Sequence, residues 1–173
     1  CTWDDGKINL LDTPGYADFK GDMVSALRVS DSALLVISAP SGIEVGTSQA
    51  WDVCEEFKIP KAVVINKLDR ENTDFNSVMG AISSRWGRQC VAVQLPQGSE
   101  ESFSGVTDLL DGQSIDGEAH ALRERIIEAA AEADTELEEK YLLEETLDQE
   151  EILRGLRKGI LERTIVPVFV VSA

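Results

Sequence analysis

Two short polar motifs in this chain have residue types that suit nucleotide chemistry. The motif DTPG at residues 12–15 follows an apolar run at residues 8–11, and NKLD at residues 66–69 follows an apolar run at residues 62–65. The first motif can hold a magnesium ion and approach a γ-phosphate, and the second can bind a guanine base. Each follows a predicted buried strand, and open parallel sheets bind ligands at the carboxyl ends of their strands. Together, the motifs predict a GTP site.

Neither motif is specific when it is taken alone. Pro-Gly suits the central positions of a type II turn, so DTPG occurs by chance in many turns, and Asp12 could serve only as a turn cap. NKLD could equally be a polar turn between a strand and a helix. The prediction therefore depends on the two motifs following strands of one sheet.

The spacing of apolar residues predicts the helices and strands that position these motifs. A hairpin is expected over residues 1–11, because Asp-Gly favours a two-residue turn. The spacing predicts helices at residues 17–31, 47–57 and 75–86, and strands at residues 33–38, 61–65 and 166–171. This order indicates an α/β fold of parallel strands joined by right-handed crossovers, with the two near-continuous apolar strands, at 33–38 and 61–65, buried on both faces.

An acidic segment interrupts this order at residues 89–163. It contains 19 acidic and 7 basic residues, and the whole chain has a formal net charge of −16. We expect strands at residues 90–95 and 105–110 in a small local sheet, a helix at 118–141, and a second helix after Asp148, which has Glu151 in a capping arrangement. Little direct contact with nucleic acid is expected, because such surfaces need clustered Lys and Arg. The segment faces either solvent alone or a protein partner.

Length and composition limit the possible domain organisation and location of the protein. A chain of 173 residues with 43% apolar residues can build one packed domain with an insertion. Its three cysteines are widely spaced, which favours buried thiols in a cytoplasmic protein over disulfides. No apolar run is long enough for a membrane span, and no secretory signal opens the chain. The sequence begins at Cys1 and lacks the phosphate loop G-x-x-x-x-G-K-[ST], so we expect it to begin after that loop.

Longer stretches around the motifs carry a family resemblance. They are INLLDTPGYADF at 8–19, NKLD at 66–69, QLP at 94–96 with FSGVTDLL at 103–110, and PVF at 167–169 before Ser172 and Ala173. The chain resembles elongation factor G, the ribosomal translocase, and its elongation factor G-like paralogues. The resemblance implies a P-loop NTPase-type GTPase core at residues 1–88 and 164–173. It also implies an inserted α+β subdomain at 89–163 that contacts the ribosomal stalk protein.

The resemblance also implies roles for individual residues. Asp12 would hold Mg²⁺, and the backbone N–H of Gly15 would meet the γ-phosphate. Asn66 would assist base recognition, and the stem of Lys67 would cover the guanine face. Asp69 would accept hydrogen bonds from the guanine N1–H and exocyclic amine, whereas adenine presents an acceptor there.

Three further positions complete the expected GTP/GDP site. Ser172 and Ala173 resemble a loop whose amide contacts guanine O6. Tyr16 departs from the family, which usually has His after Pro-Gly to position the attacking water. A phenol exchanges hydrogen bonds but is a poor base at neutral pH. We therefore take Tyr16 as the candidate catalytic residue and regard the usual mechanism as altered.

The resemblance leaves functions of two classes open. The first is a ribosome-associated GTPase, either a translocase-like elongation factor or a tetracycline-resistance type ribosome-protection factor. The second is a nucleotide-dependent protein-binding module with little hydrolysis, which Tyr16 favours. Without a phosphate loop, the 173-residue chain alone is expected to be inactive and to bind GTP weakly.

Overall fold

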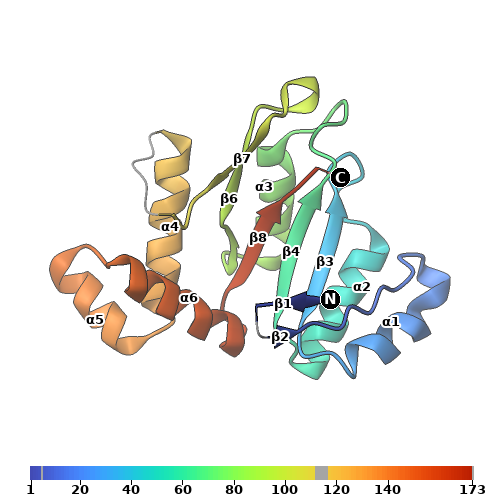
Figure 1. Ribbon diagram of the computed structural model, residues 1–173, viewed down its shortest axis with the longest axis horizontal. Helices are drawn as coiled ribbons and strands as arrows, with labels where there is room; N and C mark the ends of the chain where they lie inside the picture. The colour runs from blue at the N-terminus through green and yellow to red at the C-terminus, as the bar shows by residue number, and fades with distance from the viewer. Residues whose placement is uncertain (5, 112–116, 173) are drawn as a thin grey trace.

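A four-stranded parallel sheet forms the centre of the molecule (Figure 1). The computed structural model describes residues 1–4, 6–111 and 117–172. The strands are β3 (Ala33–Ser38), β4 (Lys61–Asn66), β8 (Val166–Val170) and β5 (Cys90–Ala92), in the spatial order β3-β4-β8-β5. This arrangement confirms the α/β class and brings the carboxyl ends of β4 and β8 together.

Two helices cover one face of this sheet. They are α2 (Val45–Phe57) and α3 (Phe75–Trp86), whose apolar sides pack against Leu35 and Ile37 of β3 and their neighbours on β4 and β8. The rings of Trp51 and Trp86 stack between these helices with centroids 4.3 Å apart. The expected helices at 47–57 and 75–86 are therefore confirmed, the first beginning two residues earlier.

The other face of β3 is open, which corrects the expectation of burial on both faces. Leu34 and Val36 are 64% and 58% exposed, while their neighbours Leu35 and Ile37 are buried. Side chains alternate between faces along a strand. Because α2 and α3 both lie on the Leu35 and Ile37 side, no helix among the described residues covers the opposite side of β3.

The N-terminal segment differs from its prediction. Strands β1 (Thr2–Trp3) and β2 (Gly6–Lys7) pair as the expected hairpin, but residues 8–15 form no strand. Ile8, Leu10 and Leu11 are 45%, 73% and 56% exposed. Ile8 N donates to Cys1 O at 2.9 Å and extends the hairpin, but residues 9–15 pair with no described strand, and an isolated strand gains little without a pairing edge. The chain continues into a short 3-10 helix, η1 (Ala17–Phe19), and α1 (Lys20–Leu27).

The acidic segment forms a hairpin and three helices. These elements are β6 (Gln94–Gln97), the 3-10 turn η2 (Glu100–Ser102), β7 (Gly105–Asp108), α4 (Glu118–Glu132), α5 (Thr135–Glu144) and α6 (Gln149–Glu162). Figure 1 shows α4, α5 and α6 grouped beside β8, away from α1 and α2. The helices share an apolar core that includes Ile126, Leu137 and Ile152.

Two predictions for this segment are wrong in their boundaries. The expected strand at 90–95 is divided, because Cys90–Ala92 pairs with β8 in the central sheet and Gln94–Gln97 pairs with β7. The expected helix at 118–141 breaks before Asp134, whose carboxylate accepts a hydrogen bond from Glu136 N at 3.0 Å and caps α5. The predicted capping box of Asp148 and Glu151 is confirmed at the start of α6.

The three cysteines are free thiols with different surroundings. Cys54 and Cys90 are buried, as expected, whereas Cys1 is exposed. Burial raises the pKa of Cys54 to about 11 and that of Cys90 to about 12, so both stay protonated at neutral pH. Among the described residues, no helix is long and apolar enough to cross a membrane.

Candidate functional site

The guanine-type motif forms a loop directly after β4. Asn66 ends the strand, and its side-chain Oδ1 accepts a hydrogen bond from Lys67 N at 2.7 Å. Lys67 has a left-handed backbone with φ of 67°, which turns the chain away from the sheet. Ala39 N, after β3, donates to Asn66 O at 2.8 Å. The ends of two neighbouring strands therefore fix the beginning of this loop.

Asp69 and Ser172 meet, although 103 positions separate them in the sequence. Val171 N donates to Ile65 O at 2.9 Å, which brings the chain after β8 alongside the loop after β4. A side-chain hydrogen bond with Ser172 lowers the pKa of Asp69 below its ordinary value, and Arg70 and Lys67 act in the same direction. Asp69 is therefore a carboxylate at neutral pH, and its Oδ2 lies 3.6 Å from Arg70 Nε. Ala173, also expected here, lies outside the described residues.

A buried threonine supports this loop from below. Thr73 is 5% exposed, and its hydroxyl lies 3.0 Å from Leu68 O and 2.7 Å from Arg70 O. Leu68 is 2% exposed and anchors the loop in the apolar core. The sequence motifs do not point to Thr73, although a threonine shortly after NKLD is a recognisable signal for a hydroxyl that bonds to nearby carbonyl groups.

The phosphate-type motif is much less constrained. Asp12 is exposed and Tyr16 is 80% exposed. Neither side chain has a hydrogen bond or ion pair with any residue that the structure describes. The best-defined contact is made by Gly15, whose carbonyl oxygen lies 2.5 Å from the place where a Cβ on Gly46 would be. The motif therefore lies against the start of α2.

The chemistry of Asp12 fits a magnesium ion that has other ligands. No group of three or more His, Cys, Asp or Glu side chains in the described part of the chain could hold a metal by itself. Mg²⁺ commonly takes one or two carboxylates and completes its shell with water and substrate phosphates. Asp12 has no competing partner among the described residues, so its carboxylate is available for such a role.

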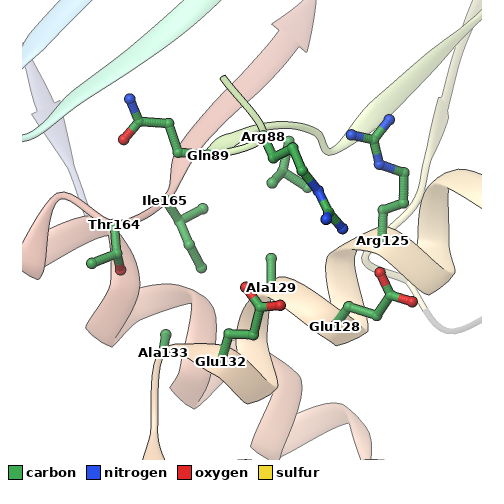
Figure 2. Close-up of a pocket in the computed structure, with 10 residues that line it drawn as sticks. Arg88, Gln89, Arg125, Glu128, Ala129, Glu132, Ala133, Thr164 and Ile165 are labelled. Atoms are coloured by element: carbon green, nitrogen blue, oxygen red, sulfur yellow. The ribbon is translucent and has the colours of Figure 1, made fainter. Parts of the chain in front are cut away.

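A separate cavity of about 300 Å³ lies at the opposite end of the sheet (Figure 2). It is lined by residues that precede β5 and β8, such as Gln89 and Ile165, and by α4. Figure 2 shows the Arg88 side chain extending toward α4, which carries Arg125 and Glu128. Parallel sheets bind ligands at the carboxyl ends of their strands. This cavity is at their amino ends, so we assign the candidate nucleotide site to the loops after β4 and β8.

Comparison with known proteins identifies the family. The model of the elongation factor Tu GTP binding domain matches residues 1–173. The chain belongs to this family. It is also similar to a crystal structure of a protein from Thermus thermophilus, with a TM-score of 0.83 and 29% sequence identity. That match covers 93% of this chain and 26% of the Thermus chain, so this domain spans about a quarter of its length.

The family confirms the general predictions made from the motifs. The chain belongs to the GTP-binding domain family of translation elongation factor-type GTPases, whose ligands are guanine nucleotides, and its parallel sheet has the P-loop GTPase fold. Of the residues expected to form the site, the structure joins Asn66 and Lys67 in one loop and brings Asp69 to Ser172. It describes no hydrogen bond or ion pair between Asp12 or Tyr16 and that group.

Proposed function

We propose that this domain belongs to a ribosome-associated, translocase-like elongation factor of the cytoplasm that couples GTP hydrolysis to its work on the ribosome. The observation that carries the proposal is that Asp69 and Ser172 lie on adjacent loops at the carboxyl ends of neighbouring parallel strands, which Val171 N joins by donating to Ile65 O at 2.9 Å. This is where α/β sheets bind ligands. The Asp69 carboxylate also suits guanine, because a carboxylate accepts hydrogen bonds from both N1–H and the exocyclic amine.

In this proposal, the loop after β4 selects the base. Asp69 faces the guanine edge, and Ser172 holds one carboxylate oxygen so that the other can accept from the ligand. Asn66 already bonds to Lys67 N and so fixes the turn, while the aliphatic stem of Lys67 lies over the base. Adenine would present an acceptor to the Asp69 carboxylate, and the resulting repulsion excludes ATP.

The segment with DTPG acts on the phosphate side. Asp12 would hold Mg²⁺, which when bound neutralises charge on the phosphate oxygens. Gly15 would offer its backbone N–H to the γ-phosphate, and Tyr16 would orient the attacking water through its hydroxyl. The exposure of all three residues is compatible with these roles. The 173-residue chain alone, which contains no phosphate loop, should bind GDP weakly and hydrolyse no GTP, as calorimetry and phosphate release would show.

The test of guanine recognition is Asp69→Asn in the protein that contains this chain. An amide can donate to the C2 carbonyl of xanthine but cannot accept from two guanine donors. We therefore expect GDP affinity to fall at least about a hundredfold and XDP affinity to rise, because buried groups left unpaired give large discrimination. Equal binding of GDP and ADP by the wild-type protein would refute the guanine site.

The acidic insertion at residues 89–163 is proposed to contact the ribosomal stalk protein. Leu142 and Leu143 at the end of α5 are 76% and 86% exposed, and Glu139, Glu144 and Glu145 surround them in the sequence. An apolar pair with acidic neighbours suits a partner that presents apolar side chains bordered by Lys or Arg.

Leu143→Ser tests this contact, and Leu161→Ser is its matched control because Leu161 is 63% exposed on α6. Binding of purified stalk protein should weaken for the first variant and not for the second. It should also weaken as salt is raised. Equal binding by both variants and the wild-type protein would place the contact elsewhere.

A second candidate function is a nucleotide-dependent binding module with little hydrolysis. Tyr16 favours it, because a phenol cannot replace the imidazole as a base. Single-turnover GTP hydrolysis on ribosomes separates the two candidates. A GTP-dependent ribosome complex that does not turn over would support the module.

A further inference from the structure

A turn of the acidic insertion contacts the loop of the guanine motif directly. Glu100 begins the 3-10 turn η2, and its backbone N donates to Leu68 O at 2.9 Å. Its side chain also takes part, since Oε1 accepts a hydrogen bond from Asn72 N at 2.7 Å. Glu100 therefore holds two points on the loop, one on each side of Asp69 and Arg70.

The η2 turn is rigid enough to act as a support. Ser99 and Ser102 form a reciprocal capping box across it, and Phe103 N donates to Glu100 O at 3.0 Å. Gly98 enters the turn with φ of 78°, and a Cβ there would lie 2.2 Å from Ser102 O. Phe103 packs against the main apolar core. Contacts outside the guanine loop therefore also fix the position of Glu100.

Left-handed residues concentrate at this contact. Lys67, Asn72 and Glu100 have φ of 67°, 60° and 52°, although none of them is glycine. Such conformations carry strain, which persists when surrounding contacts impose it and which clusters at functional sites. Two of the three residues are the partners in the Asn72–Glu100 hydrogen bond. The bond therefore holds a conformation that the loop would not prefer by itself.

We infer that Glu100 is a positioning residue for guanine recognition: it holds the loop at residues 66–72 in the conformation that presents Asp69 to the base. This inference rests on the proposed guanine site and adds a residue to it from the insertion. Thr73 secures Leu68 O from within the same loop, and Glu100 secures it from a separate element. Without the Glu100 contacts, the loop at residues 66–72 would be ordered only when nucleotide binds. The free-energy cost of that ordering would lower the affinity for nucleotide.

The test measures mant-GDP dissociation and the affinity ratio of GDP to IDP in the protein that contains this chain. IDP lacks the exocyclic amine, so the ratio reports how well Asp69 is placed. Glu100→Ala should speed GDP dissociation about three- to tenfold, the scale of one hydrogen bond, and reduce the ratio. Glu100→Gly should do the same, and its φ suits glycine, so it controls for strain in the alanine variant.

Two matched variants separate positioning from a general effect of the turn. Glu100→Gln keeps an oxygen that accepts from Asn72 N, and Glu101→Ala removes an adjacent exposed carboxylate that has no bond to a described residue. Both should keep the wild-type dissociation rate and ratio. Wild-type values for Glu100→Ala and Glu100→Gly would overturn the inference while leaving the guanine site intact. A wild-type protein that does not bind GDP would refute the proposed site, and the inference with it.

Discussion

The two halves of the candidate nucleotide site differ in how the described residues hold them. On the guanine side, Asn66 and Asp69 are joined to neighbouring loops by hydrogen bonds, and Leu68 is buried beneath them. On the phosphate side, Asp12 and Tyr16 have no such bonds within the described residues. The difference indicates that, in the proposed site, base recognition would be organised by the sheet itself. Contacts with the phosphates would depend on the backbone of the single loop at residues 12–15.

Thr73→Val should have the largest effect on folding. It removes a buried hydroxyl whose single proton is shared between Arg70 O at 2.7 Å and Leu68 O at 3.0 Å. Leu68 O keeps its bond from Glu100 N, but Arg70 O loses this donor, so the guanine loop should lose about 1–3 kcal/mol of stability. Chemical denaturation followed by tryptophan fluorescence measures it, because the stacked pair Trp51 and Trp86 lies in the core of this domain.

Thr13→Val is the control from the phosphate side. Thr13 has the same chemistry but no hydrogen bond to any described residue through its side chain. Its change in unfolding free energy should stay within about 0.5 kcal/mol, as for most surface substitutions. Similar losses of unfolding free energy for the two variants would show that the guanine loop and the DTPG loop do not differ in this respect.

Tyr16 variants should change turnover and leave affinity alone. In the proposed site, the Tyr16 side chain would approach the attacking water, while the ground-state phosphate would meet the neighbouring backbone. Tyr16→His should raise ribosome-stimulated kcat about tenfold by supplying a base, and Tyr16→Phe should lower it. Single-turnover hydrolysis and GTP affinity decide the matter. Identical rates for all three proteins would show that Tyr16 is remote from the chemistry.

Gly46→Ala should disturb the phosphate side selectively. The added Cβ would lie 2.5 Å from Gly15 O. Because the loop that contains Gly15 has few other contacts, we expect this loop to move away from α2. We expect GTP affinity to fall about threefold or more while GDP affinity is retained, since in the proposed site Gly15 would meet only the γ-phosphate. Gly21→Ala, which would meet no atom within 4 Å, is the matched control. Equal losses for GDP and GTP would contradict the role of Gly15.

Ser172→Ala should change guanine affinity least of these variants at neutral pH, and it should lower that affinity more clearly at acidic pH. Asp69 has a lowered pKa in the folded protein, so its carboxylate persists as the pH falls toward its ordinary value of 3.8. Removing the Ser172 hydroxyl raises that pKa, and guanine affinity should then be lost at a higher pH. At pH 7 the affinity should fall only about two- to threefold. An unchanged acid limb in GDP titrations would show that Ser172 does not set the pKa of Asp69.

The structure bears out the sequence predictions best where one local pattern decides the outcome. The helices near 47–57 and 75–86 and the capping box at Asp148 depend on neighbours within a few positions. The same kind of pattern predicts a strand at residues 8–11, and that prediction is wrong. A strand requires an edge to pair with. Ile8 exchanges backbone hydrogen bonds with Cys1, but the described residues provide no such partner for Leu10 and Leu11.

By itself, the sequence determined the order of elements, the two motifs and the family to which they belong. Only the tertiary structure decided that Asp69 meets Ser172 and that Glu100 holds Leu68 and Asn72. These contacts join residues 28 to 103 positions apart. No local periodicity specifies them, because they arise from how parallel strands align at their carboxyl ends and from how the insertion folds back on the sheet.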